Sequence, residues 1–183
     1  MARILVASLG QIDRLELGLC RYINRSSQVT AIRQFFSLVS WLGNGWLWYL
    51  LIALALFREP DVGALQAAQL LATGAVGVAV YKLIKEFAVR ERPFINDAAI
   101  TCGCAPLDRY SFPSGHTLHA VSFALMLAHY CPTWWPLVTV FAALVAASRV
   151  VLGLHYPTDV AAGALLGGGL ATISLRLAES VPL

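Results

Sequence analysis

Charged side chains are scarce in this chain. Only 13% of its 183 residues are Asp, Glu, Lys or Arg, whereas a typical soluble domain carries roughly 25%. The scarcity is concentrated in four long stretches that hold no charge, at residues 34–57, 62–81, 110–148 and 160–175. A soluble helical domain would have to bury all four of them. They are too long for that, so the soluble class is excluded.

These uncharged stretches have the lengths of membrane spans. A helix needs about 20 apolar residues to cross the hydrocarbon core, within a range of about 17–25. The longest stretch is interrupted by a Pro-Trp turn at residues 131–136, which divides it into two spans. We therefore predict an all-α integral membrane bundle of about five spans, at residues 34–57, 62–84, 114–131, 134–153 and 157–178.

Residues 1–33 show a different pattern. Apolar residues recur there at helical spacing between polar ones, at Leu5, Leu9, Ile12, Leu19 and Ile23. This periodicity predicts an amphipathic helix that lies in the membrane interface. The sequence shows no repeat, no low-complexity linker and no second domain. We expect a single membrane domain over 1–183, with an interfacial segment at 1–33 and a transmembrane catalytic bundle at 34–183.

Small residues recur every four positions in the last predicted span, at Gly163, Gly167 and Ala171. This spacing places them on one helix face, where the backbone of a second helix can approach closely. We interpret the repeat as a helix-packing seam. These glycines need no catalytic role.

Three groups of polar residues interrupt the apolar background, and the first is Lys85-x6-Arg92-Pro93. Seven helical steps of about 100° come within about 20° of two full turns. Both cations are therefore expected on one helix face, with Arg92 at the helix end because a following proline disfavours helical geometry. An ammonium and a guanidinium can together hold a phosphate dianion. Taken alone, the two would be interpreted as snorkelling cations under the positive-inside rule.

The second group is Pro113-Ser114-Gly115-His116. A proline and an N-cap type of serine before an apolar run predict the start of a helix. Free N–H groups at a helix start bind anions, and the helix dipole favours negative charge there. The glycine lets a ligand approach the backbone closely, and His116 in the first turn could donate a proton.

The third group is Ser148-Arg149-x5-His155-x3-Asp159. Pro157 is a good first-turn residue for the final helix, so Asp159 lies close enough to accept a hydrogen bond from His155. That bond would fix the imidazole tautomer and leave the other nitrogen free to attack phosphorus. Arg149 is expected to bind phosphoryl oxygens, and Ser148 to add a hydroxyl. Together the three groups indicate a site for phosphoester hydrolysis.

These groups resemble the three signature motifs of the type 2 phosphatidic acid phosphatase superfamily, and every fixed position matches. The resemblance implies a helical membrane bundle with its site at one membrane face and without metal or cofactor. It implies His155 as the nucleophile, which forms a phosphohistidine and is oriented by Asp159. It implies His116 as the acid that protonates the leaving group. The phosphoryl group would be held by Lys85, Arg92, Ser114, Gly115, His116 and Arg149. The chain departs from the common six-span pattern, because an amphipathic segment stands where a first span would be.

We predict metal-independent hydrolysis of a lipid-linked phosphate or pyrophosphate, of the undecaprenyl pyrophosphate, phosphatidic acid or phosphatidylglycerol phosphate type. One alternative is a lipid phosphotransferase, in which a lipid alcohol replaces water at phospho-His155. Another is a non-catalytic membrane protein that binds anions or lipids in the same basic pocket. The His155–Asp159 pair favours an enzyme, because binding needs cations but no activated nucleophile. The expected partners are the lipid substrate and the membrane, with no nucleic acid and no obligate protein partner.

Two further patterns suggest metal or thiol chemistry. His116-x-x-His119 could supply two metal ligands on a helix face, but no firm ligand set accompanies the pair. Cys102-Gly103-Cys104 would need two more ligands to bind zinc, and the remaining cysteines do not form a matching pair. These thiols are expected either to be free or, in an oxidising compartment, to form a disulfide with Cys20.

Two arguments about sidedness disagree. With five spans the N-terminus and the site share a face, and 11 of the 13 Lys and Arg residues lie on that face. This bias favours a cytoplasmic site, whereas the family resemblance implies an extracytoplasmic one. We follow the resemblance, because catalytic cations account for part of the bias and interfacial arginines also bind anionic lipid. The expectation is a multi-pass protein of a bacterial cell (inner) membrane with an extracytoplasmic site.

Overall fold

The described part of the computed structural model, residues 14–58 and 60–180, consists of helices and connecting loops. A helix over residues 14–24 is followed by α2 (Thr30–Trp41), α3 (Leu47–Arg58), α4 (Pro60–Phe87), α5 (Pro93–Asn96), α6 (Gly115–Tyr130), α7 (Trp135–Val151) and α8 (Pro157–Ser180). Short irregular turns of helix lie between them, η1 (Arg25–Gln28), η2 (Leu42–Trp46) and η3 (Pro132–Trp134). The predicted all-α class is confirmed.

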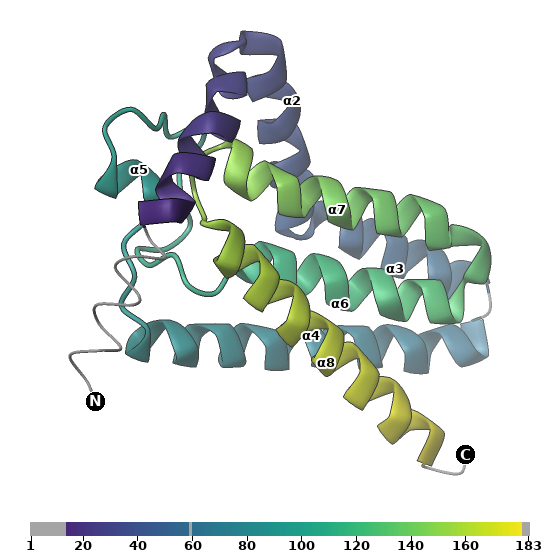
Figure 1. Cartoon of the computed structure of the whole chain (residues 1–183). Helices are drawn as coiled ribbons and strands as arrows, with labels where there is room; N and C mark the ends of the chain where they lie inside the picture. The colour runs from purple at the N-terminus through teal and green to yellow at the C-terminus, as the bar shows by residue number, and fades with distance from the viewer. Residues whose placement is uncertain (1–13, 59, 181–183) are drawn as a thin grey trace.

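Helix α6 is the central element of the bundle. It packs against α4, α7 and α8, as Figure 1 shows, while α3 packs against α4. Buried side chains therefore occur all around α6 and not along a single stripe. In the core, Trp48 of α3 lies between Phe123 and Phe141, with ring centroids 5.8 Å and 5.3 Å away. Aromatic pairs at such distances add to the stabilisation that burial provides.

The predicted membrane spans correspond to helices of the structure. Within the described residues, four helical segments are long and apolar enough to cross a membrane: Thr30–Phe57, Gly63–Phe87, Pro132–Val151 and Pro157–Ser180. Helix α6, with 16 residues, coincides with the span predicted at 114–131 but is shorter than these four segments. The spans predicted at 62–84, 114–131, 134–153 and 157–178 each coincide with one helix to within a few residues. The prediction of a multi-pass membrane protein is confirmed.

The first predicted span, 34–57, lies within the helical segment Thr30–Phe57, but a kink that the sequence analysis did not foresee divides this segment. The segment η2 interrupts it, because Asn44 and Gly45 leave the helical region and Gly45 has φ 124°. Helices α2 and α3 consequently run in different directions (Figure 1). Glycine adopts a positive φ because it has no Cβ, and a Cβ at Gly45 would lie 2.8 Å from the Tyr49 ring. Apolar composition could not reveal the break, since glycine is frequent in membrane helices.

The helix over residues 14–24 packs on the loops at the end of the bundle where α6 begins (Figure 1). Cys20 is buried there, and the Asn24 amide donates to the carbonyls of Thr101 and Val151 at 3.0 Å and 2.9 Å. Leu15 and Leu19 remain exposed. Part of the predicted amphipathic segment is therefore helical, and its first 13 residues lie outside the described ones. Its position in the membrane interface stays a prediction.

The small residues of α8 form the predicted packing seam against α6. The buried residues of α8 are Asp159, Gly163, Gly167 and Ala171, which repeat every four positions. A Cβ at Gly163 would lie 2.5 Å from the carbonyl oxygen of Ser114, and one at Gly167 would clash with the carbonyl of Leu118. The two backbones thus touch directly. Because Asp159 begins this buried face, the seam sets its position relative to the start of α6.

The seam predicts the effect of adding one methyl group. Gly167→Ala is expected to lower the thermal unfolding temperature of the detergent-solubilised protein, because overpacking costs about 1–3 kcal/mol. Gly169→Ala is the matched control, since a Cβ there meets nothing within 4 Å and alanine favours the helix. Equal unfolding temperatures of the two variants would show that the backbones do not depend on this contact.

Candidate active site

Lys85 and Arg92 meet at one carboxylate. Lys85 lies in the last turn of α4, and Arg92 follows in extended conformation, with φ −79° and ψ 154°. The Lys85 Nζ and the Arg92 Nη2 both donate to Oδ1 of Asp108, at 2.6 Å and 2.7 Å. The expectation that one helix face carries both cations is wrong, because α4 already ends at Phe87. The residue before a proline prefers extended geometry. The non-helical segment after α4 therefore brings Arg92 close to Lys85.

The buried guanidinium of Arg92 connects two segments of the site. Its Nε and Nη2 donate to carbonyl oxygens of residues 108–110 at 3.1–3.3 Å. Its Nη1 donates to the carbonyl of Leu154 at 2.7 Å and lies 3.2 Å from Nε2 of His155. Arg92 therefore holds the loop that carries Asp108 against the chain segment that carries His155.

The start of α6 lies where the sequence predicted it. Ser114 is the N-cap, and its Oγ accepts the N–H of Thr117 at 3.4 Å. Its own N–H donates to the backbone carbonyl of Asp159 at 3.0 Å, which ties the start of α6 to α8. Gly115 and His116 form the first turn of α6 and line the cavity described below. Ser114 itself is fully buried behind them.

The end of α7 brings Arg149 and His155 together. Gly153 has φ 72°, and the N–H groups of Gly153 and Leu154 donate to the carbonyls of Val150 and Arg149, each at 3.0 Å. This is the Schellman arrangement that often ends helices, and it favours glycine at the left-handed position. The turn folds the chain back so that His155 faces the end of its own preceding helix. Sequence analysis missed Gly153, although a glycine just after an apolar helical run signals such an end.

His155 and Asp159 face each other without a direct hydrogen bond. Their Nδ1 and Oδ2 atoms are 3.6 Å apart, which is longer than a hydrogen bond. Oδ2 instead accepts the N–H of Tyr156 at 2.8 Å and the hydroxyl of Ser111. The predicted bond is thus not formed in this structure. Catalytic hydrogen bonds are often long before substrate binds and tighten in the reacting complex.

Arg90 reaches the other oxygen of Asp159, a contact that sequence analysis missed. Its Nη1 donates to Asp159 Oδ1 at 2.6 Å and to the Thr158 hydroxyl at 2.8 Å. Its Nη2 donates to Oε2 of Glu16 at 2.6 Å, and the guanidinium lies 3.9 Å from the ring centroid of Tyr156. No sequence signal distinguishes Arg90 from the other basic residues around it, because its partners are remote in the chain.

The electrostatic environment keeps His155 neutral and Asp108 ionised. His155 is only 2% exposed, and its burial lowers the pKa of the imidazole well below the usual range, with the charges of Arg149, Arg92 and Lys85 acting in the same direction. A neutral imidazole is the form that can act as a nucleophile. Burial acts to raise the pKa of Asp108, but the hydrogen bond and charge of Lys85, with those of Arg92, outweigh it and lower this pKa.

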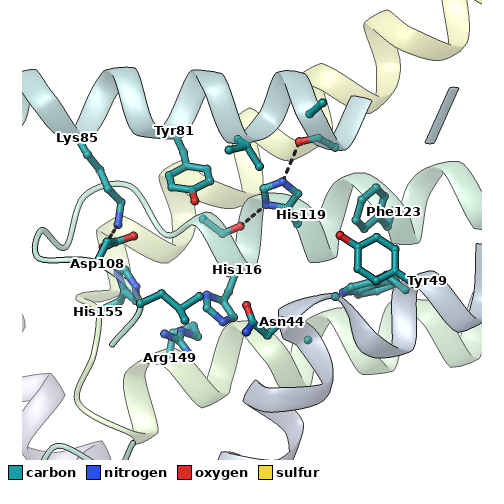
Figure 2. Close-up of a pocket in the computed structure, with 18 of the residues that line it drawn as sticks. Asn44, Tyr49, Tyr81, Lys85, Asp108, His116, His119, Phe123, Arg149 and His155 are labelled. Carbon is teal, nitrogen blue, oxygen red and sulfur yellow. Dashed lines mark hydrogen bonds and ion pairs between the residues drawn. The ribbon is translucent and has the colours of Figure 1, made fainter. Parts of the chain in front are cut away.

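A cavity of about 320 Å³ unites these groups. Figure 2 shows Lys85 against Asp108 near His155, with Arg149 and His116 next along the wall and Tyr49 and Phe123 farther from them. The polar end is lined by Lys85, Arg92, Asp108, His116, Arg149 and His155. The remaining wall comes largely from apolar residues of α3, α4 and α6, among them Trp48, Leu71, Val78 and Phe123. A concave apolar site with a few convergent polar groups is typical of ligand binding.

Unpaired polar atoms are concentrated on this cavity. Among the described residues, the buried side-chain nitrogens and oxygens without a hydrogen-bond partner are Trp48 Nε1, Arg149 Nε and His155 Nδ1. All three residues line the cavity. Buried polar atoms are nearly always paired, so each exception needs an explanation. His155 Nδ1 faces Asp159 at 3.6 Å, which leaves Arg149 Nε as an unpaired donor at the cationic end of the cavity. Arg149 also donates from Nη1 to the hydroxyl of Ser40, a further contact that sequence analysis missed.

Ser148 and His119 make structural contacts instead of the ones considered from the sequence. The Ser148 hydroxyl donates to the carbonyl of Val145 in its own helix at 2.6 Å, and Ser148 is not among the cavity-lining residues. The ring nitrogens of His119 lie 2.8 Å from the Gly115 carbonyl and 3.0 Å from the Gly74 carbonyl. His119 therefore joins α6 to α4, and both of its nitrogens face oxygen partners.

The cysteines are all free thiols in the structure. Cys20 is buried, and its burial raises the pKa of the thiol to about 12, with the carboxylates of Glu16 and Asp159 adding to the shift. Cys102 is exposed on the long loop, and Cys104 is partly exposed. Of the two alternatives left open by the sequence, the structure has the free thiols.

The cavity, cationic at one end and apolar at the other, suits a membrane enzyme that acts on a phosphorylated lipid. The sequence pattern of the PAP2 superfamily matches residues 66–181, more than half of the chain, and this protein therefore belongs to the PAP2 superfamily. The family inferred from the three motifs is confirmed, and with it the class of enzyme, a membrane lipid phosphatase.

Known proteins share both sequence and fold with this chain. The undecaprenyl-diphosphatase of Sulfolobus acidocaldarius is 30% identical over 162 residues, which cover 86% of this chain and 76% of that protein. The decaprenylphosphoryl-5-phosphoribose phosphatase of Mycobacterium tuberculosis is 33% identical over 130 residues, or 70% and 69% of the two chains. The crystal structure of Aquifex aeolicus LpxE superimposes with a TM-score of 0.76 at 28% identity, covering 88% of this chain and 95% of that one.

The position of Asp108 predicts how the site responds to phosphate. Its carboxylate lies where the two cations expected to bind phosphate converge, so an incoming phosphate would have to displace it. Asp108→Asn is expected to lower the inhibition constant of inorganic phosphate roughly tenfold, which corresponds to about 1.4 kcal/mol. Asp97→Asn is the matched control, because Asp97 pairs with Arg21 and not with the site. An unchanged or higher inhibition constant in Asp108→Asn would contradict the displacement.

Proposed function

We propose that this protein hydrolyses a polyprenyl-linked phosphate or diphosphate, of the undecaprenyl pyrophosphate type, through a phosphohistidine at His155. The single observation that carries this proposal is the cavity that joins a cationic end at His155 to an apolar end between α3, α4 and α6. Such a cavity suits a ligand with a phosphate at one end and a hydrocarbon chain attached to it. Cations near the bilayer are costly unless they are paired or solvated, which favours a role for them in binding phosphate.

The orientation of the His155 ring supports attack by Nε2. Nδ1 faces Asp159, whereas Nε2 lies 3.2 Å from Nη1 of Arg92 on the cationic side of the cavity. In the first step Nε2 forms a bond to phosphorus and the bond from phosphorus to the leaving oxygen breaks. His116 gives a proton to that oxygen. In the second step a water attacks phosphorus, His116 takes its proton, and the bond between phosphorus and nitrogen breaks.

The cations of the site would stabilise the transferring phosphoryl group. In this reaction the protein acts mainly by positioning the reactants and by stabilising charge on the equatorial oxygens. Lys85 and Arg92 already hold an anion, because both donate to one oxygen of the Asp108 carboxylate. The unpaired Nε of Arg149 is a further donor on the same cavity. Gly115 in the first turn of α6 would leave its helix start accessible to the phosphate.

The size of the cavity and the named relatives favour a single-chain lipid. A volume of about 320 Å³ is near the lower end of the range for ligand pockets, and it suits one chain better than two. The two relatives described above are named for substrates that carry one polyprenyl chain. Phosphatidic acid and phosphatidylglycerol phosphate, which carry two acyl chains, are the alternatives. A phosphatidylglycerophosphatase of Escherichia coli is also related, at 32% identity over 80 residues.

Phosphate release from a panel of polyprenyl and glycerolipid phosphates tests the proposal, with a chelator present throughout. The wild-type protein is expected to release phosphate fastest from the polyprenyl diphosphate. His155→Ala should abolish release, and His116→Ala should reduce it by roughly 10²–10⁴-fold, the usual contribution of general acid catalysis. Rapid quenching with labelled substrate should leave label on His155.

His129→Ala is the matched control for both histidine variants. His129 lies in the last turn of α6, exposed and away from the cavity, so its replacement should leave turnover unchanged. Wild-type release by His155→Ala would refute the phosphohistidine. Release that appears only after a lipid alcohol is added would identify a phosphotransferase, and binding without any turnover would identify a lipid-binding protein.

We also propose that the site lies on the extracytoplasmic face of the bacterial inner membrane. Two natural cysteines allow a direct test, because Cys102 is exposed on the loop at the site and Cys131 lies between α6 and α7 at the opposite end. In variants that retain one of them, with Cys104 replaced by serine, a membrane-impermeant maleimide should label Cys102 in intact cells. Cys131 should react only after permeabilisation. Buried Cys20 can remain, since its raised pKa suppresses reaction. The reverse labelling would place the site in the cytoplasm.

A further inference from the structure

We propose that Arg90, held by Glu16 of the N-terminal helix, is a positioning residue that orients Asp159 and, through it, the ring of His155. Neither Arg90 nor Glu16 is a fixed position of the three sequence motifs. The inference rests on the proposed function, in which His155 is the nucleophile. It assigns a role in turnover to a segment that otherwise only covers the end of the bundle.

The two oxygens of Asp159 have different partners. Oδ2 is on the side of His155 and accepts from the backbone of Tyr156 and the hydroxyl of Ser111. Oδ1 is bound by the guanidinium of Arg90 at 2.6 Å. Asp159 is 0% exposed, and a buried carboxylate is costly unless a charge pairs with it. Among the described residues, Arg90 supplies that charge through an ion pair, so it determines which way the carboxylate plane faces.

Arg90 is itself held from two sides. Glu16 accepts from its Nη2 at 2.6 Å, and the Tyr156 ring lies under the guanidinium at 3.9 Å. Glu16 is buried and also accepts the N–H and the hydroxyl of Thr158, both at 2.8 Å. The Glu16 carboxylate therefore binds Arg90 and the first turn of α8 together. A guanidinium fork can make these paired contacts, whereas an ammonium could satisfy only part of them.

The backbone next to Arg90 completes the arrangement. The N–H of Ser111 donates to the carbonyl of Arg90 at 2.8 Å, and the Ser111 hydroxyl donates to Asp159. The same residue pair thus reaches both oxygens of Asp159, through the Arg90 side chain at Oδ1 and through Ser111 at Oδ2. A shift of Arg90 would move both contacts. Loss of its charge is expected to let the carboxylate turn away from the productive orientation.

A role in positioning differs from simple docking of the N-terminal helix, and the chain offers the comparison. Arg21 lies on the same helix as Glu16 and forms an ion pair with Asp97, away from Asp159. Arg21→Gln should weaken docking without touching the chain of contacts from Glu16 through Arg90 to Asp159. If the helix matters only as a cover, Glu16→Gln and Arg21→Gln should affect turnover alike.

The test measures kcat and KM for the preferred lipid phosphate, with unfolding temperature recorded for each full-length variant. Arg90→Gln should lower kcat by about 10–100-fold, the loss typical of residues that orient a functional side chain without contacting the substrate. KM should change by less than about twofold. Arg90→Lys should restore part of kcat. Glu16→Gln should lower kcat about fivefold, since a neutral hydrogen bond replaces a charged one. Arg21→Gln should leave kcat unchanged.

A double-mutant cycle with Asp159→Asn identifies the path of the effect. If Arg90 acts through Asp159, then Arg90→Gln should add little further loss in the Asp159→Asn background. A full kcat in folded Arg90→Gln, a fully additive loss in the double variant, or an equal loss in Arg21→Gln would each overturn the inference. Should Arg90→Gln fail to fold, Arg90→Lys and Glu16→Gln provide the same comparison.

The His155→Ala variant separates this inference from the proposed function. If His155→Ala retains turnover, the proposed function fails. If His155→Ala is inactive and Arg90→Gln retains full kcat, only the positioning role fails. Both results are read from the same assay on the same purified protein.

Discussion

The structure depends on pairing positive charges with carboxylates at one end of an apolar bundle. A buried cation without a partner is costly, and three cations close to His155 have a carboxylate partner. Asp108 pairs with both Lys85 and Arg92, and Asp159 pairs with Arg90. These two carboxylates have different surroundings. Asp108 lies on a loop and pairs with the cations proposed to bind phosphate, whereas Asp159 is buried in the first turn of α8.

Helix packing places the paired charges where they can meet. The direct backbone contact between α6 and α8 sets Asp159 beside the start of α6, because glycines leave no side chain between the two helices. The glycine turn at the end of α7 then brings His155 back toward Arg149. Neither contact involves a reacting group, yet both determine the distances between the polar residues of the site. Membrane helices associate through such close packing since lipid offers little hydrophobic drive between them.

Much of the architecture was predictable from the sequence, because each predicted span lies largely within a long uncharged stretch. Six residues of the three motifs line one cavity, and Ser114, Ser148 and Asp159 are buried. The sequence analysis did not predict the local backbone geometry at two places. Arg92 is not on the helix of Lys85, and the helical segment of the first predicted span is kinked at Gly45. Proline and glycine determine both outcomes through local backbone preferences, which an apolar pattern does not record.

By itself the sequence determined the class of this protein: an apolar chain that must be helical in a membrane, with cations, two histidines and an aspartate that suit phosphoryl transfer. Only the tertiary structure decided which charges neutralise one another. The pairs formed by Asp108, and by Glu16 with Arg90, join residues that no spacing in the chain relates. The physical reason is that electrostatic pairing depends on distance in space and on burial. Both arise when the helices pack.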